Sequence, residues 1–202
     1  MLDYNKIIFA TPLTSYVYKN DKLNNDLIKL TYALKKRVKS NSLSNAGGWQ
    51  SPNVDLSNPV INNFLKLIFP KIEEHVKQYQ LKHTHEVIIT NLWLNVNGPN
   101  DYNTAHHHIH DALDFVGVYY MKVPKNSGDL FINNPDFSSG SRNIFYQERH
   151  CNVFNQQKIK IAAKEQSLLL FSAGLVHSVS RNDSKSDRLS LSFNIKVQTK
   201  ND

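Results

Sequence analysis

The sequence contains a single cysteine, Cys151, among its 202 residues. One cysteine excludes an internal disulfide and a cysteine-based zinc site, and it suits a reducing compartment. No apolar run approaches the roughly 18 residues needed to cross a bilayer, and the first residues lack the charged and apolar regions of a secretion signal. We therefore expect a protein that does not associate with membranes and is cytoplasmic.

Acidic residues are also in deficit, since 17 Asp and Glu face 24 Lys and Arg and leave a net charge of +7. This balance favours anionic partners, such as nucleic acid or a small dicarboxylate. The only dense basic run is ALKKRVK, residues 33–39, on a predicted helix. A solvated helical face explains this run at least as well as a phosphate-binding surface does.

The chain has no internal repeat and no low-complexity linker, and its length fits one domain of ordinary size. We predict a single domain over residues 1–202, with a helical part over about 1–85. In that part, apolar residues recur at helical spacing from Asp21 to Lys39. A second helix begins at Asn58 and Pro59 and continues to about Gln80. Pro70 lies inside it, so we expect a kink or a split there.

After His85 the pattern changes to alternating β-branched and aromatic residues. Short strands are predicted over 86–96, 115–123, 129–133, 158–162, 166–172, 176–181 and 187–197. Strands without helices between them favour a sandwich or barrel, so we expect an α+β fold whose all-β part covers about 86–202. Residues 137–155 lack a clear period, and a connection of this length is usually a lid or binding loop, or is poorly ordered.

Four of the five positions from His106 to His110 are histidine. His106, His108 and His110 alternate with other residues, so in an extended backbone any pair two residues apart can chelate a metal ion. Such a pair needs a third ligand, and His177 at the start of a later strand offers one. Histidines in a loop are usually only solvated, and we expect this of His107.

On the predicted strand 187–197, one face carries Arg188, Ser190, Ser192 and Asn194. In a half-buried strand this polar face would be the solvent side. If the sheet instead closes into a barrel with a polar interior, the same residues line a pocket. A buried arginine then needs an anion as its partner. The two interpretations make opposite predictions about burial.

Several motifs resemble those of a bacterial and phage branch of the Fe(II)- and 2-oxoglutarate-dependent oxygenases, and they occur in the same order along the chain. They are GWQS at 48–51, HIH at 108–110 before VGVYY at 116–120, SGDLF at 127–131, and LLLFSAGLVHSVSRNDSKSDRLSLSFN at 168–194. The resemblance implies a double-stranded β-helix, a jelly-roll or cupin-like barrel, with the N-terminal helices packed on it. If a phage encodes the chain, the expected location becomes the host cytoplasm.

The resemblance also implies a dioxygenase that uses Fe(II), 2-oxoglutarate and O₂ to hydroxylate a C–H bond, with decarboxylation of 2-oxoglutarate to succinate. The implied metal ligands are His108, His110 and His177, and His106 with His108 is the alternative register. The superfamily carries a carboxylate two residues after its first histidine, where this sequence has His110. Asp111 or Asp114 could supply a carboxylate by a different local path. Three neutral imidazoles would leave the iron site one unit more positive than the usual ligands.

By the same resemblance, Arg188 binds the distal carboxylate of 2-oxoglutarate, helped by the Ser190 hydroxyl that projects from the same face of the strand. Only one of Tyr119 and Tyr120 can face the pocket, and we expect Tyr119 to give a second hydrogen bond to the cosubstrate. Three residues of strand 86–96 share a face that could line the pocket, although packing within the sheet is the favoured interpretation: Asn91, Trp93 and Asn95.

Two other function classes stay open. One is a cupin-like metalloenzyme that uses three histidines without 2-oxoglutarate. The other is a basic β-domain that binds nucleic acid through the run 33–39 and aromatic residues of 137–155. This second class leaves the histidine spacing unexplained. As an oxygenase, the protein could act on a small molecule, a peptide or a nucleic acid, since specificity lies in loops that one sequence does not decode.

Overall fold

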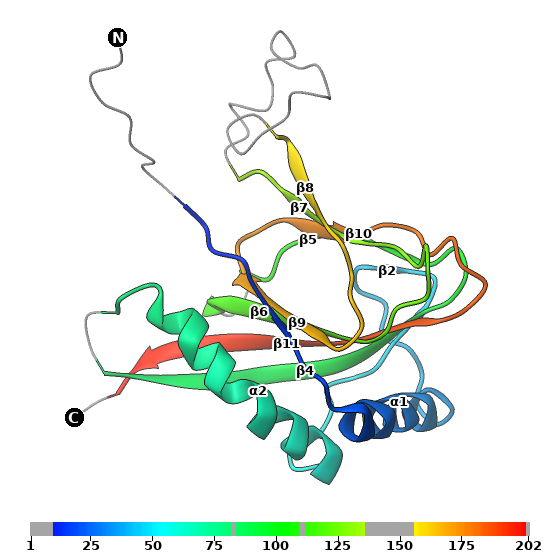
Figure 1. Ribbon diagram of the computed structural model, residues 1–202, viewed down its shortest axis with the longest axis horizontal. Helices are drawn as coiled ribbons and strands as arrows, with labels where there is room; N and C mark the ends of the chain where they lie inside the picture. Colours follow the sequence, from blue (N-terminus) through cyan, green and yellow to red (C-terminus); the bar gives the residue numbers. More distant parts are fainter. Residues whose placement is uncertain (1–9, 82–83, 110–111, 136–155, 201–202) are drawn as a thin grey trace, which may run out of the picture.

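The computed structural model describes residues 10–81, 84–109, 112–135 and 156–200. Two antiparallel sheets lie face to face, and both helices pack on the outer face of the larger sheet (Figure 1). The helices are α1 (Asp21–Lys35) and α2 (Pro59–Lys77). The strands are β1 (Thr14–Val17), β2 (Asn45–Ala46), β3 (Trp49–Gln50), β4 (His85–Asn97), β5 (Tyr102–His106), β6 (Phe115–Lys122), β7 (Leu130–Asn133), β8 (Lys158–Ile161), β9 (Ser167–Ser172), β10 (His177–Val179) and β11 (Arg188–Thr199). The prediction of a jelly-roll barrel with the N-terminal helices packed on it is confirmed.

The larger sheet has the order β1-β9-β6-β11-β4-β3, and the smaller sheet has the order β2-β5-β10-β7-β8. From β4 onward the chain crosses repeatedly from one sheet to the other, which is the winding of a jelly roll. β11 pairs with β4 along its whole length and with β6 on its other side. These three strands therefore form the centre of the larger sheet.

All seven predicted strands are present, and their ends agree within two residues. Four further strands, β1, β2, β3 and β5, were not predicted. β2 and β3 have two residues each, which is too short to show a period. β5 is mostly polar, so it gives no alternating pattern. Residues 137–155, interpreted as a lid or binding loop, lie outside the described residues.

Both predicted helices form, with two differences. α1 ends at Lys35 rather than Lys39, and α2 continues through Pro70 without the expected split. Pro70 is exposed, so its missing hydrogen bond lies on the solvent side. On the opposite side, α2 buries a row of apolar side chains that hold it to the sheet: Ile61, Phe64, Ile68, Ile72 and Val76. Of the helices in the described part of the chain, none has the length and apolar character needed to cross a bilayer.

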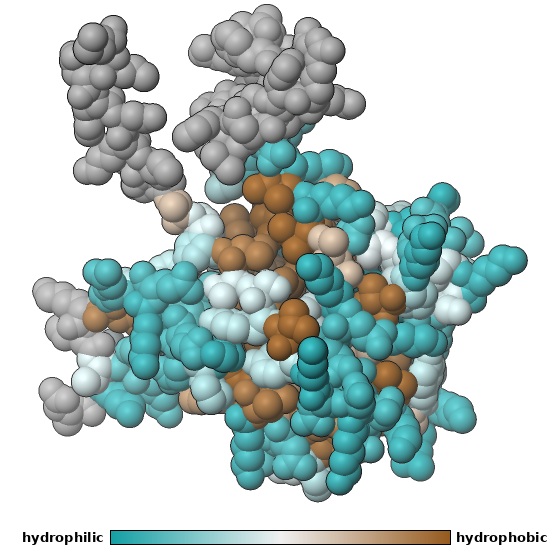
Figure 2. Space-filling model, viewed as in Figure 1, coloured by the Kyte–Doolittle hydropathy of each residue, from teal (hydrophilic) through white to brown (hydrophobic). Residues whose placement is uncertain are grey.

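The larger sheet separates two apolar layers. Leu189, Leu191, Phe193 and Ile195 of β11 belong to the layer beneath the helices. The alternate residues are buried between the sheets: Arg188, Ser190, Ser192 and Asn194. The solvent-side interpretation of this polar face is therefore wrong, and the barrel-interior interpretation is confirmed. The face of the molecule shown in Figure 2 is mainly hydrophilic, with apolar side chains gathered between the helices and the β7–β8 hairpin.

Candidate metal and cosubstrate site

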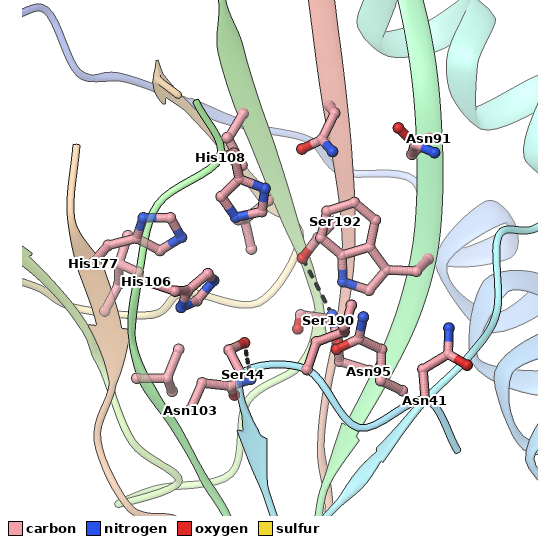
Figure 3. Close-up of a pocket in the computed structure, with 18 of the residues that line it drawn as sticks. Asn41, Ser44, Asn91, Asn95, Asn103, His106, His108, His177, Ser190 and Ser192 are labelled. Carbon is pink, nitrogen blue, oxygen red and sulfur yellow. Dashed lines mark hydrogen bonds between the residues drawn. The ribbon is translucent and has the colours of Figure 1, made fainter. Parts of the chain in front are cut away.

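Three histidines meet between the two sheets (Figure 3). β5 and β10 are antiparallel neighbours, and their register places His106 directly opposite His177. His108 follows β5 by two residues, and its backbone N–H donates to the Ala173 carbonyl at 2.8 Å. Each of the three imidazoles offers one nitrogen, and these nitrogens all lie within 4.8 Å of one another. This spacing allows all three to bind one metal ion.

The backbone orients two of these rings. His106 Nδ1 lies 2.8 Å from the Thr104 carbonyl, and His177 Nδ1 lies 2.8 Å from the Leu175 carbonyl. An Nδ1–H that donates to a carbonyl leaves the lone pair on Nε2, which is how metal-binding histidines are usually fixed. His108 stacks between the rings of Trp93 and His177, at centroid distances of 5.8 and 5.2 Å.

The environment also keeps imidazoles of this cluster neutral. Burial, with His106 close by, lowers the pKa of His177 to about 3. Burial likewise lowers the pKa of His106 below its ordinary value. Metal ions bind the neutral form of imidazole, so this cavity holds both side chains in the form that a metal requires. The donor set therefore fits a transition metal such as iron.

The register of the described cluster is the alternative one, with His106 rather than His110 beside His108. His110 and Asp111 lie outside the described residues. Among the residues that the structure does describe, no carboxylate belongs to the cluster. His107, expected at the surface, contributes to the cavity wall but not to the cluster.

A cavity of about 700 Å³ surrounds the histidines. Its walls come from both sheets and from residues 41–53, which precede α2. Within the described residues, Arg188 is the only Lys, Arg, Asp or Glu that lines it. The cavity therefore combines a metal-binding cluster with a single fixed positive charge.

Arg188 is 2% exposed, and its Nε and Nη1 are buried without a hydrogen-bond partner. Its guanidinium lies 5.6 Å from the centre of the Tyr120 ring, and burial lowers its pKa. A buried cation without an anion is costly, so this one indicates a place for an anionic ligand. A guanidinium can bind a carboxylate through two parallel hydrogen bonds. Arg188, with Ser190 beside it in the same wall, thus fits the distal carboxylate of 2-oxoglutarate.

The expectation for Tyr119 is wrong. Its hydroxyl donates to Asn24 Oδ1 at 3.3 Å, and its ring packs on Phe64, on the helix side of the sheet. Tyr120 faces the cavity instead and lies against Arg188. β6 is buried on both faces, so the hydrophobic pattern could not tell which tyrosine points inward.

The favoured interpretation of the three strand residues Asn91, Trp93 and Asn95 is also wrong, because all three line the cavity. The alternation of the sequence showed that the three residues share a face of the strand. It did not show that this face turns toward the cavity. Further lining residues were not predicted to line the cavity, because they lie in short or irregular segments without a period, although Gln50 belongs to the GWQS motif: Asn41, Ser44, Gln50 and Asn103.

A family model described as "Putative 2OG-Fe(II) oxygenase" matches residues 91–194. A search of curated proteins finds no significant match. Among solved structures, the fold is similar to a Pseudomonas putida prolyl-4-hydroxylase (11% identity, TM-score 0.65, 94% of this chain and 93% of that chain covered). It is also similar to HygX from Streptomyces hygroscopicus, solved with nickel and 2-oxoglutarate bound (11% identity, TM-score 0.59, 92% of this chain and 83% of that chain covered). A third similar structure is that of the epimerase SnoN from nogalamycin biosynthesis (12% identity, TM-score 0.63, 94% of this chain and 81% of that chain covered).

The family match covers half of the chain and includes all three clustered histidines and Arg188. The protein therefore belongs to the 2OG-Fe(II) oxygenase family, as a dioxygenase that depends on Fe(II), 2-oxoglutarate and O₂.

Proposed function

We propose that this oxygenase is a hydroxylase. It converts a substrate C–H bond to C–OH with one oxygen atom of O₂, while the other enters the succinate formed as 2-oxoglutarate loses CO₂. The bound iron supplies the activation of O₂, and the protein positions the reactants and excludes water. The observation that carries the proposal is an unpaired, buried guanidinium in the same cavity as three clustered histidines.

His106, His108 and His177 would hold the iron. Three imidazoles bring no negative charge, so the metal would keep its full double charge. A dianionic cosubstrate would offset that charge more strongly than a neutral one. The ligand set and the choice of 2-oxoglutarate are therefore electrostatically consistent.

Arg188 would bind the distal carboxylate of 2-oxoglutarate and so fix which end of the molecule reaches the metal. Tyr120 covers one side of the guanidinium, and Ser190 offers a hydroxyl from the same wall. A rigid fork of donors restricts both the position and the rotation of a carboxylate. Val116, Val118 and Leu130 provide an apolar wall that limits the water around the bound cosubstrate.

The proposal is tested with iron-loaded protein and 2-oxoglutarate, first without any substrate. Slow release of succinate is expected, and ¹⁸O₂ should later place ¹⁸O in the substrate alcohol. Arg188→Ala should weaken 2-oxoglutarate binding by at least about 30-fold, the lower end of the cost of losing one partner of a buried charge pair. Ni(II) binding by the same variant reports whether the histidine cluster is still intact.

Arg181→Ala is the matched control, because Arg181 is exposed and pairs with Asp183 at 2.7 Å. It should leave 2-oxoglutarate binding unchanged. If the wild type neither binds 2-oxoglutarate nor releases succinate, the proposal fails. If Arg188→Ala binds 2-oxoglutarate normally, the role given to the guanidinium is wrong.

A further inference from the structure

One wall of the cavity is built from uncharged polar side chains of β4 and β11. The register places Asn194 opposite Asn91 and Ser192 opposite Trp93. We call the set Asn91, Asn95, Ser192 and Asn194 the amide wall. Figure 3 shows Asn91, Asn95 and Ser192 on this side of the cavity, across from His106 and His177. Because Arg188 is assigned to 2-oxoglutarate, no charged side chain among the described lining residues remains for the substrate. The group that enters beside the amide wall is therefore uncharged.

Asn194 indicates that this group forms hydrogen bonds. Asn194 is 8% exposed, and its Oδ1 is buried without a donor. Unpaired buried acceptors are rare in folded proteins, so this oxygen calls for a donor that the described residues do not supply. Asn95 Nδ2 donates to Ser192 Oγ at 3.2 Å, which holds the neighbouring part of the wall in place. A ligand with an N–H at its edge would satisfy the Asn194 oxygen.

Trp93 makes part of the same wall flat. Its indole is partly exposed and lines the cavity, and the His108 ring stacks on part of it at a centroid distance of 5.8 Å. An aromatic surface of this kind binds planar rings by stacking, and it is tolerant of which base is bound. An uncharged planar ring with hydrogen-bonding groups at its edge is the description of a nucleobase.

Basic residues lie where the chain leaves α1 and approaches the cavity. We call Lys35, Lys36, Arg37 and Lys39 the basic rim. All four are exposed, and none forms an ion pair with an acidic residue in the described part of the chain.

Hydrogen bonds between side chains and the backbone join this rim to the cavity wall. The Val38 carbonyl accepts from Trp49 Nε1 at 2.9 Å, and Ser40 Oγ accepts from the Gln50 N–H at 3.0 Å. Asn41 and Gln50 then line the cavity. Lys39 is flanked by both of these contacts and lies two residues before Asn41, so the rim is held close to the cavity wall. Cations at this place can neutralise phosphates next to a base that is bound inside.

We propose that the substrate is a nucleobase-bearing phosphate compound, a nucleotide or a single strand. The base lies on Trp93 and the amide wall, and its phosphates lie on the basic rim. This inference rests on the proposed function, because it assigns the remaining space of that site to the substrate. One C–H bond of the bound nucleotide becomes C–OH, and O₂ and 2-oxoglutarate are consumed as above.

The test uses the fluorescence of Trp93 in the full chain with Ni(II) and 2-oxoglutarate bound, so that no turnover occurs. The only other tryptophan, Trp49, is buried at 6% exposure, and the Trp93→Phe variant provides its signal for subtraction. The probes are single-stranded twelve-residue DNA and RNA, the four 5′-mononucleotides, the nucleosides, and an abasic strand of equal length. A capped proline-containing tripeptide and a neutral disaccharide serve as other candidate occupants.

Quenching that saturates with base-containing strands or nucleotides, but not with the abasic strand, is expected. Comparing nucleotides with strands then identifies the source of the base. Asn91→Ala, at an exposed position that does not endanger folding, should weaken this binding. Trp93→Leu should lower affinity by tenfold or more, measured by displacement of a labelled strand, since stacking on an aromatic side chain contributes about that much per base.

The basic rim is tested by the combined change Lys36→Glu, Arg37→Glu and Lys39→Glu. Its matched control changes three exposed lysines outside the cavity wall, Lys125, Lys164 and Lys185, to Glu. The rim variant should bind the twelve-nucleotide strand at least tenfold more weakly. The slope of log K against log salt concentration should become smaller in magnitude by about 2. The control variant should lose clearly less affinity for the strand than the rim variant does.

Equal binding of the abasic strand would overturn the assignment of the base, and so would saturable quenching by the peptide or disaccharide alone. Absence of any base-dependent quenching would also overturn it, even if 2-oxoglutarate binds and succinate is released. The reverse result, base binding without binding of 2-oxoglutarate, would instead remove the proposed function.

Discussion

His108 occupies the position two residues after His106, where the superfamily resembled by the sequence carries a carboxylate. In the structure its ring stacks between Trp93 and His177, which fixes it beside the other two imidazoles. A neutral ring at this position leaves the metal one unit more positive than a carboxylate would. The residue therefore changes the charge of the site without changing its place in the fold.

His106 and His110 can be compared directly, since they represent the two registers considered for the sequence. His106→Ala should lower Ni(II) affinity by more than the roughly 10- to 100-fold cost of losing an outer partner of a metal ligand. His110→Ala should leave the affinity unchanged. Isothermal titration with Ni(II) measures both variants. The opposite result would assign the metal to His108, His110 and His177.

Gly117 shows how a single missing side chain permits packing in the larger sheet. A Cβ at this position would collide with the ring of Phe193, which lies on the neighbouring strand β11. Gly117→Ala should therefore destabilise the protein by about 1–3 kcal/mol, the usual cost of overpacking a core. Urea unfolding measures the change.

Gly174→Ala is the control for this prediction. A Cβ there would meet only Ile109 Cγ2 at 3.5 Å and Ser172 Oγ at 3.8 Å, which are ordinary contacts. Its free energy of unfolding should stay close to that of the wild type. Equal destabilisation by both changes would show that the Phe193 ring is not the cause.

At the scale of elements, α2 carries one titratable side chain into its contact with the larger sheet. His75 is fully buried and lies 5.1 Å from Phe115, measured between ring centroids. Its Nδ1 is 2.6 Å from Thr14 Oγ1 of β1, and its Nε2 is buried without a partner. Burial lowers the pKa of His75, because a protonated ring here would lose its hydration.

This lowered pKa predicts a direction for the pH dependence of stability. The folded state holds His75 neutral, whereas the unfolded chain binds a proton near pH 6.5. Stability is therefore fully present above about pH 6.5 and is lost as the pH falls toward the folded pKa. The slope reaches at most about 1.4 kcal/mol per pH unit for one such histidine.

His75→Gln should reduce this slope, measured by urea unfolding of the metal-free protein between pH 7 and pH 5. His106 and His177 also have lowered pKa values, so part of the pH dependence should remain. An unchanged slope in the variant would mean that His75 is not held neutral in the folded state.

The strands could be predicted where polar and apolar side chains alternate, because such alternation means that the two faces of the strand lie in different environments. β4 and β11 were located within two residues, because they are long strands of 13 and 12 residues in which apolar and polar side chains alternate over part of β4 and most of β11. β6 was located equally well, but its two buried faces concealed which tyrosine points inward. Alternation gives the period of a strand and not the direction of its faces when both faces are buried.

At the scale of the whole molecule, the cavity exists only because the two sheets lie face to face. The histidines come from the smaller sheet and from the residues that follow β5, whereas Arg188 comes from the larger sheet. A ligand that contacts both sheets should stabilise the folded protein by mass action. Bound 2-oxoglutarate, which would bridge the metal and Arg188, is such a ligand.

Thermal unfolding tests this bridging. With Ni(II) present, 2-oxoglutarate at a hundred times its Kd should add about 2.7 kcal/mol, or roughly 5–10 °C in Tm for a chain of this size. 2-Oxopentanoate at the same concentration is the matched control, since it lacks the distal carboxylate and should raise Tm much less. Equal shifts for both compounds would show that the guanidinium does not contact the cosubstrate.

The sequence by itself determined the helices, the long strands, the spacing of the histidines and the polar face of β11, because each depends on the local period of the chain. It also carried the resemblance that pointed to Fe(II) and 2-oxoglutarate. Only the tertiary structure decided that His106 lies opposite His177, that Tyr120 rather than Tyr119 faces the cavity, and that Arg188 is buried with no acidic partner among the described residues. These facts depend on which strands pair and on which face of each strand turns inward. Contacts between residues far apart in sequence set both, and no local pattern contains them.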